Sequence, residues 1–88
     1  MDKEEFIKSL NLPFEGKSAG NDYIINLNNS DDFSTLYNII SNNINLSMDD
    51  ESITTTSNAL FTFFNDEFDL KLVADFNKDI YKLIVSDR

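Results

Sequence analysis

The sequence of 88 residues contains no cysteine, no histidine and no tryptophan. Without cysteine the chain can form no disulfide, no thiolate nucleophile and no cysteine-ligated metal site. Without histidine it lacks the commonest general base near neutral pH and the commonest metal ligand. Together the two absences exclude the standard structural zinc sites. We therefore expect no metal and no cofactor.

Basic residues are few, and they are unevenly placed along the chain. Lys and Arg number 7 against 16 Asp and Glu, so the formal net charge is −9. No basic residue lies between Lys17 and Lys71, whereas the flanking segments hold as many bases as acids. The excess of acid therefore belongs to the middle of the chain, at Asp22, Asp31, Asp32, Asp49, Asp50, Glu51, Asp66, Glu67 and Asp69.

This charge makes two classes of partner unfavourable. Nucleic acid and anionic membrane are both negatively charged, and the sequence has no basic patch that could displace their counterions. No stretch approaches the ~20 apolar residues that a membrane-spanning helix needs. The charged start of the chain does not resemble a signal peptide. We expect a cytoplasmic protein that binds neither nucleic acid nor membrane directly.

Hydrophobic residues make up 41% of the chain and include eight Phe, which suits a single α+β domain over residues 1–88. The periodicity of apolar residues predicts two helices and a series of strands in the order α-β-α-β-β-β. The helices are expected at 2–11 and 30–42, with a loop at 14–21. The four longer strands of this order are expected at 22–28, 59–64, 67–76 and 80–86, and shorter β segments are expected at 44–48 and 53–56. This order predicts an antiparallel sheet with one or two helices packed on a Phe-rich face.

Polar residues at the expected helix starts support both helices. Asp2 can cap the first helix, with Glu5 three residues later as a capping-box partner. Asn29 and Ser30 can cap the second, and Asp31 and Asp32 then fall in its first turn, where negative charge suits the helix dipole.

The first of two expected hairpins turns at Asn65-Asp66. A two-residue loop there pairs Phe63 with Phe68 and places the apolar residues of both strands on one face. A register slip by one residue would turn these apolar residues to the other face of the sheet. The apolar pattern therefore determines which residues share a face more firmly than it determines the length of the loop.

The second hairpin turns at Asn77-Lys78 and continues the same face. A two-residue loop pairs Ala74 with Tyr81, and a four-residue loop at 77–80 would instead set Asp75 opposite Lys82. Either loop gives one apolar set: Ala59, Phe61, Phe63, Phe68, Leu70, Leu72, Ala74, Tyr81, Leu83 and Val85.

The opposite face of these strands is more apolar than a fully solvated face needs to be. It includes Leu60, Val73, Ile80 and Ile84 among charged residues. We expect a helix of the same chain to cover it, and the alternative is that it binds a partner or a second copy.

No motif indicates catalysis. Starting an EF-hand loop at Asp49 puts Ile53 at position 5, and starting it at Asn65 puts Leu70 at the position of the required glycine, so both fail. An irregular calcium site at 49–51 is a minor alternative. The sequence contains no P-loop and no nucleophile elbow. We expect the protein not to be an enzyme.

Two functional classes remain. The first is an inhibitor that blocks a basic, nucleic-acid-binding surface, such as that of a nuclease, by nucleic-acid mimicry. In size, acidity and lack of cysteine the chain is similar to phage-encoded anti-restriction and anti-CRISPR proteins, although no motif is shared, and a toxin-immunity protein fits equally well. The second class is a homo-oligomeric structural or assembly module, a homodimer for instance. The expected partner-binding residues are Asp31, Asp32, Asp49, Asp50, Glu51, Asp66, Glu67 and Asp69.

Most of these acids lie at the ends of expected helices and strands. They would form one binding edge if the turns that hold them meet in space.

Overall fold

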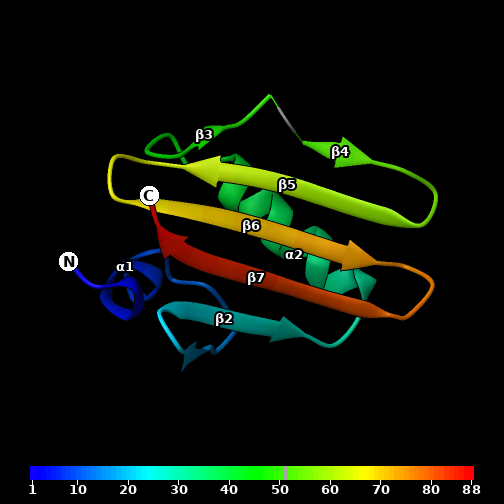
Figure 1. The fold of residues 1–88 in the computed structure, drawn as a ribbon, viewed down its shortest axis with the longest axis horizontal. Coiled ribbons are helices and arrows are strands. Elements are labelled where there is room, and N and C mark those ends of the chain that lie inside the picture. Colours follow the sequence, from blue (N-terminus) through cyan, green and yellow to red (C-terminus); the bar gives the residue numbers. More distant parts are fainter. Residues whose placement is uncertain (51) are drawn as a thin grey trace.

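Two helices and one antiparallel sheet form the fold in the computed structural model, which describes residues 1–50 and 52–88 (Figure 1). The strands are β1 (Lys17–Ala19), β2 (Asp22–Leu27), β3 (Ser47–Met48), β4 (Ile53–Thr54), β5 (Asn58–Phe64), β6 (Phe68–Asp75) and β7 (Ile80–Asp87). Their order across the sheet is β1-β2-β7-β6-β5-β3, and β4 pairs with β5 beside β3. The predicted α+β class and the order of the main elements are confirmed.

Helix α1 (Lys3–Ser9) begins as the sequence predicts. The carboxylate of Asp2 accepts a hydrogen bond from the backbone N–H of Glu5 at 2.8 Å. That bond is the main reason why the pKa of Asp2 is lowered. Phe6 and Ile7 are buried, and the Phe6 ring stacks on Phe68 with 5.0 Å between ring centroids.

Helix α2 (Ser30–Ser41) is capped by Asn29, whose side-chain oxygen accepts from the backbone N–H of Asp32 at 2.9 Å. Phe33, Leu36 and Ile40 recur at helical spacing and are buried. The helix therefore presents one apolar stripe to the sheet, and it contacts β2, β6 and β7.

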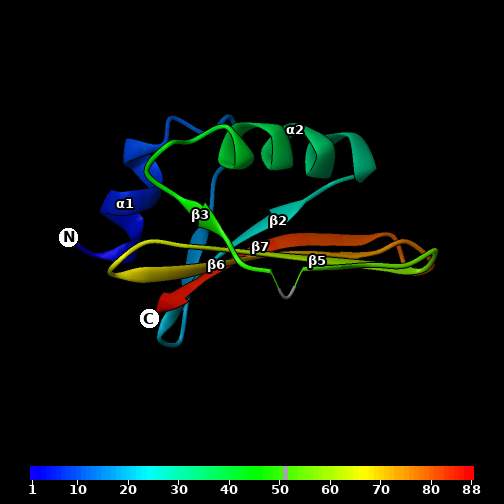
Figure 2. The same ribbon diagram turned by 90° about the horizontal axis from the view of Figure 1, so that it is seen from above.

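Both helices lie on the same side of the sheet (Figure 2). The expected apolar set of β5, β6 and β7 faces them, and all of it is buried except Phe61, which is partly buried. Leu70, Leu72 and Leu83 have no exposed surface. The single core of the domain therefore lies between this face and the two helices.

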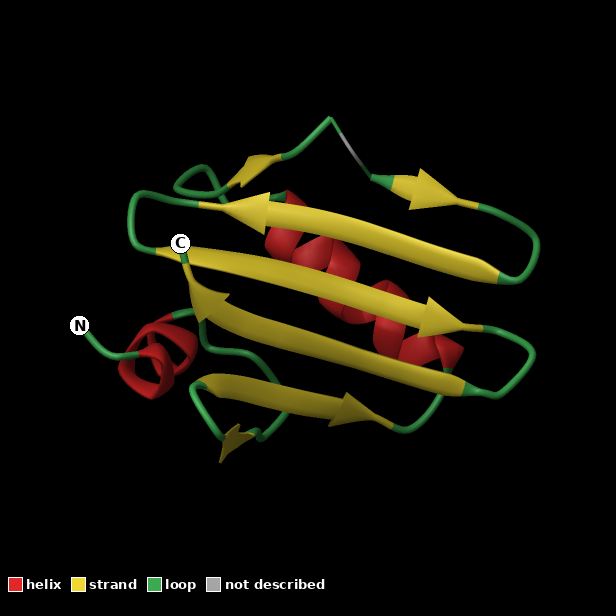
Figure 3. Cartoon of the chain, viewed as in Figure 1, coloured by secondary structure: helices red, strands yellow, loops and turns green. Residues whose placement is uncertain are grey.

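The opposite face of the sheet, here called the open face, has no helix over it in the described residues (Figures 2 and 3). The expectation that a helix of the same chain covers it is wrong, because α1 and α2 both dock on the Phe-rich face, which offers the larger apolar area. Leu60, Val73 and Ile84 are partly exposed there, and Ile80 is exposed.

The two hairpins test the predicted registers. In the second, Ala74 pairs with Tyr81 as expected, and Asp75 pairs with Ile80, so the alternative pairing of Asp75 with Lys82 is wrong. The predicted register is confirmed, although the connection spans four residues, 76–79, and not two. In the first, Phe63 pairs with Leu70, two positions beyond the predicted Phe68.

The first turn therefore centres on Asp66-Glu67, one residue later than predicted. The side chain of Asn65 sets this position, because its oxygen accepts hydrogen bonds from the backbone N–H groups of Glu67 and Phe68, both at 2.8 Å. The apolar face is unchanged, since the partner shifts by two residues.

The expected loop at 14–21 contains a strand, β1. It pairs with β2 through a turn at Gly20, whose φ of +63° favours glycine. Gly16 precedes β1, and a β-carbon there would lie 2.5 Å from Cε1 of Tyr23. These two glycines let the chain fold back closely against β2.

Strands β3 and β4 are shorter than the predicted 44–48 and 53–56. Ile44 is 96% exposed and lies outside the sheet. The hydroxyl of Thr55 accepts from the backbone N–H of Asn58 at 3.0 Å, so the chain turns there and β4 ends.

Candidate functional site

A shallow hollow of about 870 Å³ on the open face gathers three of the predicted acids. Asp49 and Asp50 reach it from the segment after β3, and Asp69 reaches it from β6. The backbone N–H of Asp49 donates to the carbonyl of Thr62 at 2.7 Å, which holds this segment against β5. Ile53 and Leu60 supply the apolar part of the lining.

The same hollow also contains two basic residues, one of which, Arg88, is 19 positions from Asp69 in the chain. Lys71 and Arg88 belong to its lining. The Arg88 guanidinium lies 4.0 Å from the centroid of the Phe64 ring and 3.4 Å from the carboxylate of Asp69. The acid block of the sequence is therefore partly neutralised here in space.

Asp66 and Glu67 form the exposed turn between β5 and β6. The Glu67 carboxylate lies 3.8 Å from the N-terminal ammonium of Met1. This turn and Asp69 belong to the same end of the sheet, next to α1 and the C-terminus (Figure 1).

Asp31 and Asp32 lie at the other end of the sheet, where α2 begins (Figure 1). Asp32 accepts a hydrogen bond from the backbone N–H of Asn28 at 3.3 Å, and Asp31 is exposed. In the described part of the chain neither carboxylate belongs to an ion pair.

The predicted acids therefore do not converge on one edge. Asp49, Asp50 and Asp69 share the hollow on the open face, Asp66 and Glu67 form the turn at one end of the sheet, and Asp31 and Asp32 lie at the other end, where α2 begins. Glu51 lies outside the described residues.

Two further acids, Asp75 and Asp79 of the β6–β7 hairpin, were not among the predicted site residues. Because Leu27 of β2 pairs with Tyr81 of β7, the β6–β7 hairpin lies beside the β2–α2 junction. Asp79 in that hairpin interacts with the Tyr81 hydroxyl, as does Ser30 of α2, and Asp75 is close enough to act on it by charge.

We call Asp31, Asp32, Asp75 and Asp79 the acidic end. Burial raises the pKa of Tyr81, and the neighbouring Asp79 and Asp75 carboxylates raise it further. Knowing that β2 and β7 are neighbours would have revealed this group, but the sequence alone did not give that pairing.

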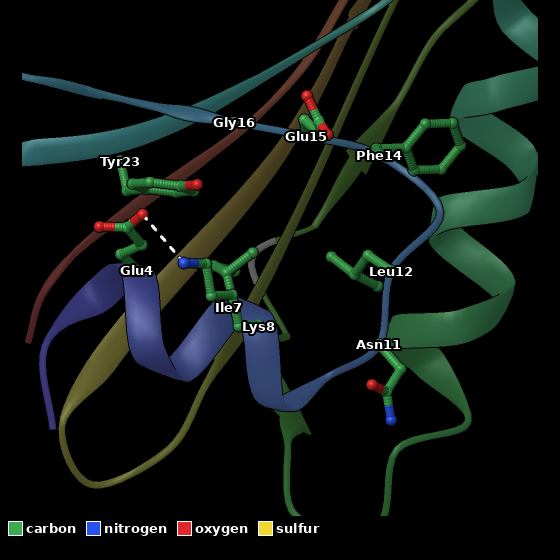
Figure 4. A pocket seen from close by; sticks show the side chains of 9 residues that line it. All are labelled: Glu4, Ile7, Lys8, Asn11, Leu12, Phe14, Glu15, Gly16 and Tyr23. Atoms are coloured by element: carbon green, nitrogen blue, oxygen red, sulfur yellow. Dashed lines mark ion pairs between the residues drawn. The ribbon is translucent and has the colours of Figure 1, made fainter.

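Another hollow, of about 430 Å³, lies between α1 and the chain leading to β1 (Figure 4). Glu4 and Lys8 on its rim form an ion pair of 3.3 Å, drawn as the dashed line. Tyr23 and Ile7 form part of its lining and are buried. Two of its three charged residues are therefore paired with each other along α1, and the third is Glu15.

Comparison of the chain with protein-family models, curated proteins and solved structures finds no match. In the described residues no helix is long and apolar enough to cross a membrane. Nor do residues 1–50 and 52–88 contain a group of three or more Asp or Glu arranged to hold a metal ion.

Proposed function

We propose that this protein binds a basic, nucleic-acid-binding surface of a partner protein and blocks it. The acidic end supports this proposal best. It combines four aspartates with two bases, Lys78 in the β6–β7 turn and Lys82 on β7, and neither Asp31 nor Asp79 belongs to an ion pair in the described part of the chain. Exposed carboxylates without a cation of their own are available to Lys and Arg of another protein.

The net charge of −9 supports the same proposal. A field of this sign speeds encounter with a basic partner and repels free nucleic acid. The carboxylates would occupy positions that phosphates take in the partner's groove. We place the protein in the cytoplasm, without catalytic activity of its own, as a counter-defence factor directed at a nuclease or as an immunity protein for a nuclease toxin.

Affinity capture from a host lysate, followed by a DNA or RNA mobility-shift assay on the captured partner, tests the proposal. We expect a nucleic-acid-binding protein that is released by high salt and loses its nucleic acid when this protein is added. A captured partner that still binds nucleic acid when saturated with this protein would contradict the proposal.

Four variants with equal charge change locate the contact. Each removes two negative charges: D31N/D79N at the acidic end, D49N/D50N at the edge, D66N/E67Q at the other turn, and E4Q/E5Q on α1 as the control. We expect D31N/D79N to weaken binding most and E4Q/E5Q least. Equal weakening by all four would mean that binding follows net charge alone, and the acidic end would then have no special role.

The open face supports a second candidate function, a homo-oligomeric assembly module. Leu60, Val73 and Ile84 are partly exposed at its centre, and no helix of the described chain covers them. Light scattering after size-exclusion chromatography tests it. A dimer that persists at high salt, and that is lost in the Val73→Lys variant, would support this candidate. A protein that remains monomeric at all concentrations would eliminate it.

A further inference from the structure

A groove of about 410 Å³ lies between α2 and the β4–β5 side of the sheet, on the same face as the helices. Four aromatic rings line it, and its remaining lining is small or polar. The rings belong to Phe33, Tyr37, Phe61 and Phe76, and the other lining residues are Ser34, Asn38, Thr54 and Ala59.

The rings hold each other in place. The centroids of Tyr37 and Phe61 are 4.7 Å apart, and Phe76 meets Phe33 edge-on at 6.4 Å. The backbone N–H of Phe76 donates to the carbonyl of Ser57 at 2.8 Å, which fixes the position of this residue after β6. The groove is therefore preformed, and a ligand need not order it.

Three of the four rings reach water, since Tyr37 and Phe61 are partly exposed and Phe76 is exposed. Phe76 is 38% exposed, unlike Phe33, which is buried beneath it. An apolar side chain that enters the groove would remove the Phe76 ring from water, and little conformational entropy would be lost because the ring is already held in place. Such aromatic pockets are where a few residues supply most of the energy of a protein interface.

The acidic end adjoins this groove. Tyr81 lies 6.0 Å from both Phe33 and Phe76, measured between ring centroids, and its hydroxyl interacts with Asp79 and Ser30. Asp31 follows Ser30 on α2, the helix that forms one wall of the groove. Apolar lining and uncompensated negative charge therefore occur side by side.

We propose that the groove receives an apolar side chain of the basic partner, preferably an aromatic one, from a segment in which Lys or Arg residues flank that side chain and contact Asp31 and Asp79. This inference rests on the proposed function and names the chemistry of the partner. A protein segment fits better than a nucleotide, because the phosphates of a nucleotide would be repelled by the same aspartates.

Three acetylated and amidated tripeptides probe the groove in the intact protein: Lys-Phe-Lys, Lys-Ala-Lys and Glu-Phe-Glu. Backbone chemical shifts of the labelled protein report where each binds. We expect Lys-Phe-Lys to shift residues lining the groove and the acidic end, and to bind about tenfold more tightly than Lys-Ala-Lys, a difference of roughly 1.4 kcal/mol. Glu-Phe-Glu should bind more weakly still.

Each alternative result has a definite meaning. Equal binding of Lys-Phe-Lys and Lys-Ala-Lys would overturn the groove while leaving the proposed function intact, since charge alone would then suffice. Equal binding of Lys-Phe-Lys and Glu-Phe-Glu would overturn the basic partner chemistry, and with it the support that the acidic end gives to the proposed function. Shifts confined to the open face would overturn the inference.

Two variants separate the groove from general charge. Ser34→Arg places a long cationic side chain in the groove, and Thr35→Arg places the same side chain on the next residue, which is exposed and does not line the groove. We expect Ser34→Arg to weaken Lys-Phe-Lys about tenfold more than Thr35→Arg does. Equal effects would overturn the inference.

Phe76→Ala should reduce the preference for Lys-Phe-Lys over Lys-Ala-Lys, with circular dichroism confirming that the variant is folded. If it does not fold, the arginine pair still decides the question, because Ser34 and Thr35 are both exposed.

Discussion

Strands β5, β6 and β7 supply side chains to both faces of the sheet, but one face is buried and the other is partly exposed. On the helix-covered face, Leu72 and Leu83 have no exposed surface. On the open face their chain neighbours Val73 and Ile84 remain partly exposed. These four residues are all aliphatic, so the helices, which cover only one face, decide which of them are buried. Burial in this protein therefore depends on which face α1 and α2 select, and that choice leaves the open face to water or to a partner.

Alanine substitution on each face tests this comparison most strongly. Leu72→Ala opens a cavity in the core and should lower the free energy of unfolding by about 3 kcal/mol. Val73→Ala, one residue along on the open face, should cost less than about 1 kcal/mol. Denaturant unfolding measures both values. A similar loss in the two variants would show that the open face is covered in solution.

The two glycines of the β1–β2 region differ in the same way, since one faces the folded chain and the other faces water. A β-carbon at Gly16 would lie 2.5 Å from Tyr23 and 2.8 Å from the carbonyl oxygen of Ile24. Gly16→Ala should therefore cost about 2 kcal/mol through overpacking. Gly20→Ala meets no atom within 4 Å, and its cost of about 1 kcal/mol comes from the positive φ alone. Thermal unfolding of both variants checks the order.

The two hairpins at opposite ends of the sheet allow a finer comparison. Asn65 accepts two backbone hydrogen bonds in the β5–β6 turn, whereas Asp75 accepts one, from Lys78 at 3.1 Å, in the β6–β7 turn. Asn65→Ala should lower stability by about 1 kcal/mol. Asp75→Ala should lower it less, because one bond is lost and some repulsion within the acidic end is relieved. The reverse order in denaturant unfolding would contradict this account.

The smallest expected effect is on Tyr81. The pKa of Tyr81 is higher in the folded protein than in the unfolded chain. The protonated phenol therefore contributes fully to the free energy of unfolding below the pKa that Tyr81 has in the unfolded chain. This contribution is lost as the pH rises through the pKa that Tyr81 has in the folded protein. Asp79→Asn removes one of the charges responsible and should lower the pKa of Tyr81. Asp66→Asn at the opposite end should leave it unchanged. Ultraviolet titration of the phenol, with Tyr81→Phe to assign the signal, measures the shift.

Local chemistry explains why much of the fold could be predicted from the sequence. The caps at Asp2 and Asn29 and the register of Ala74 against Tyr81 depend on residues close together in the chain. Strand β1 could not be predicted in the same way, because Lys17–Ala19 is short and exposed and has no alternating apolar pattern.

The candidate site was less predictable because it depends on long-range pairing. Ser30, the residue before Asp31 on α2, comes near Tyr81 and Asp79 only because β2 pairs with β7, and the sequence contains no local signal for that pairing. The same limit applies to Arg88, which neutralises Asp69 although 19 positions separate them in the chain. A one-dimensional charge map therefore overestimates how strongly the charges are separated.

The position of β7 between β2 and β6 has a consequence for biosynthesis. The hairpin of β5 and β6 can form as soon as those residues leave the ribosome, whereas β2 must wait for residues 80–87 before its inner edge has a partner. Until then the apolar stripes of α1 and α2 have only part of a sheet to cover. Folding of this sheet is therefore completed only when β7 pairs with β2, and a ribosome that stalls before residues 80–87 leaves the hydrophobic core open to chaperones and proteases.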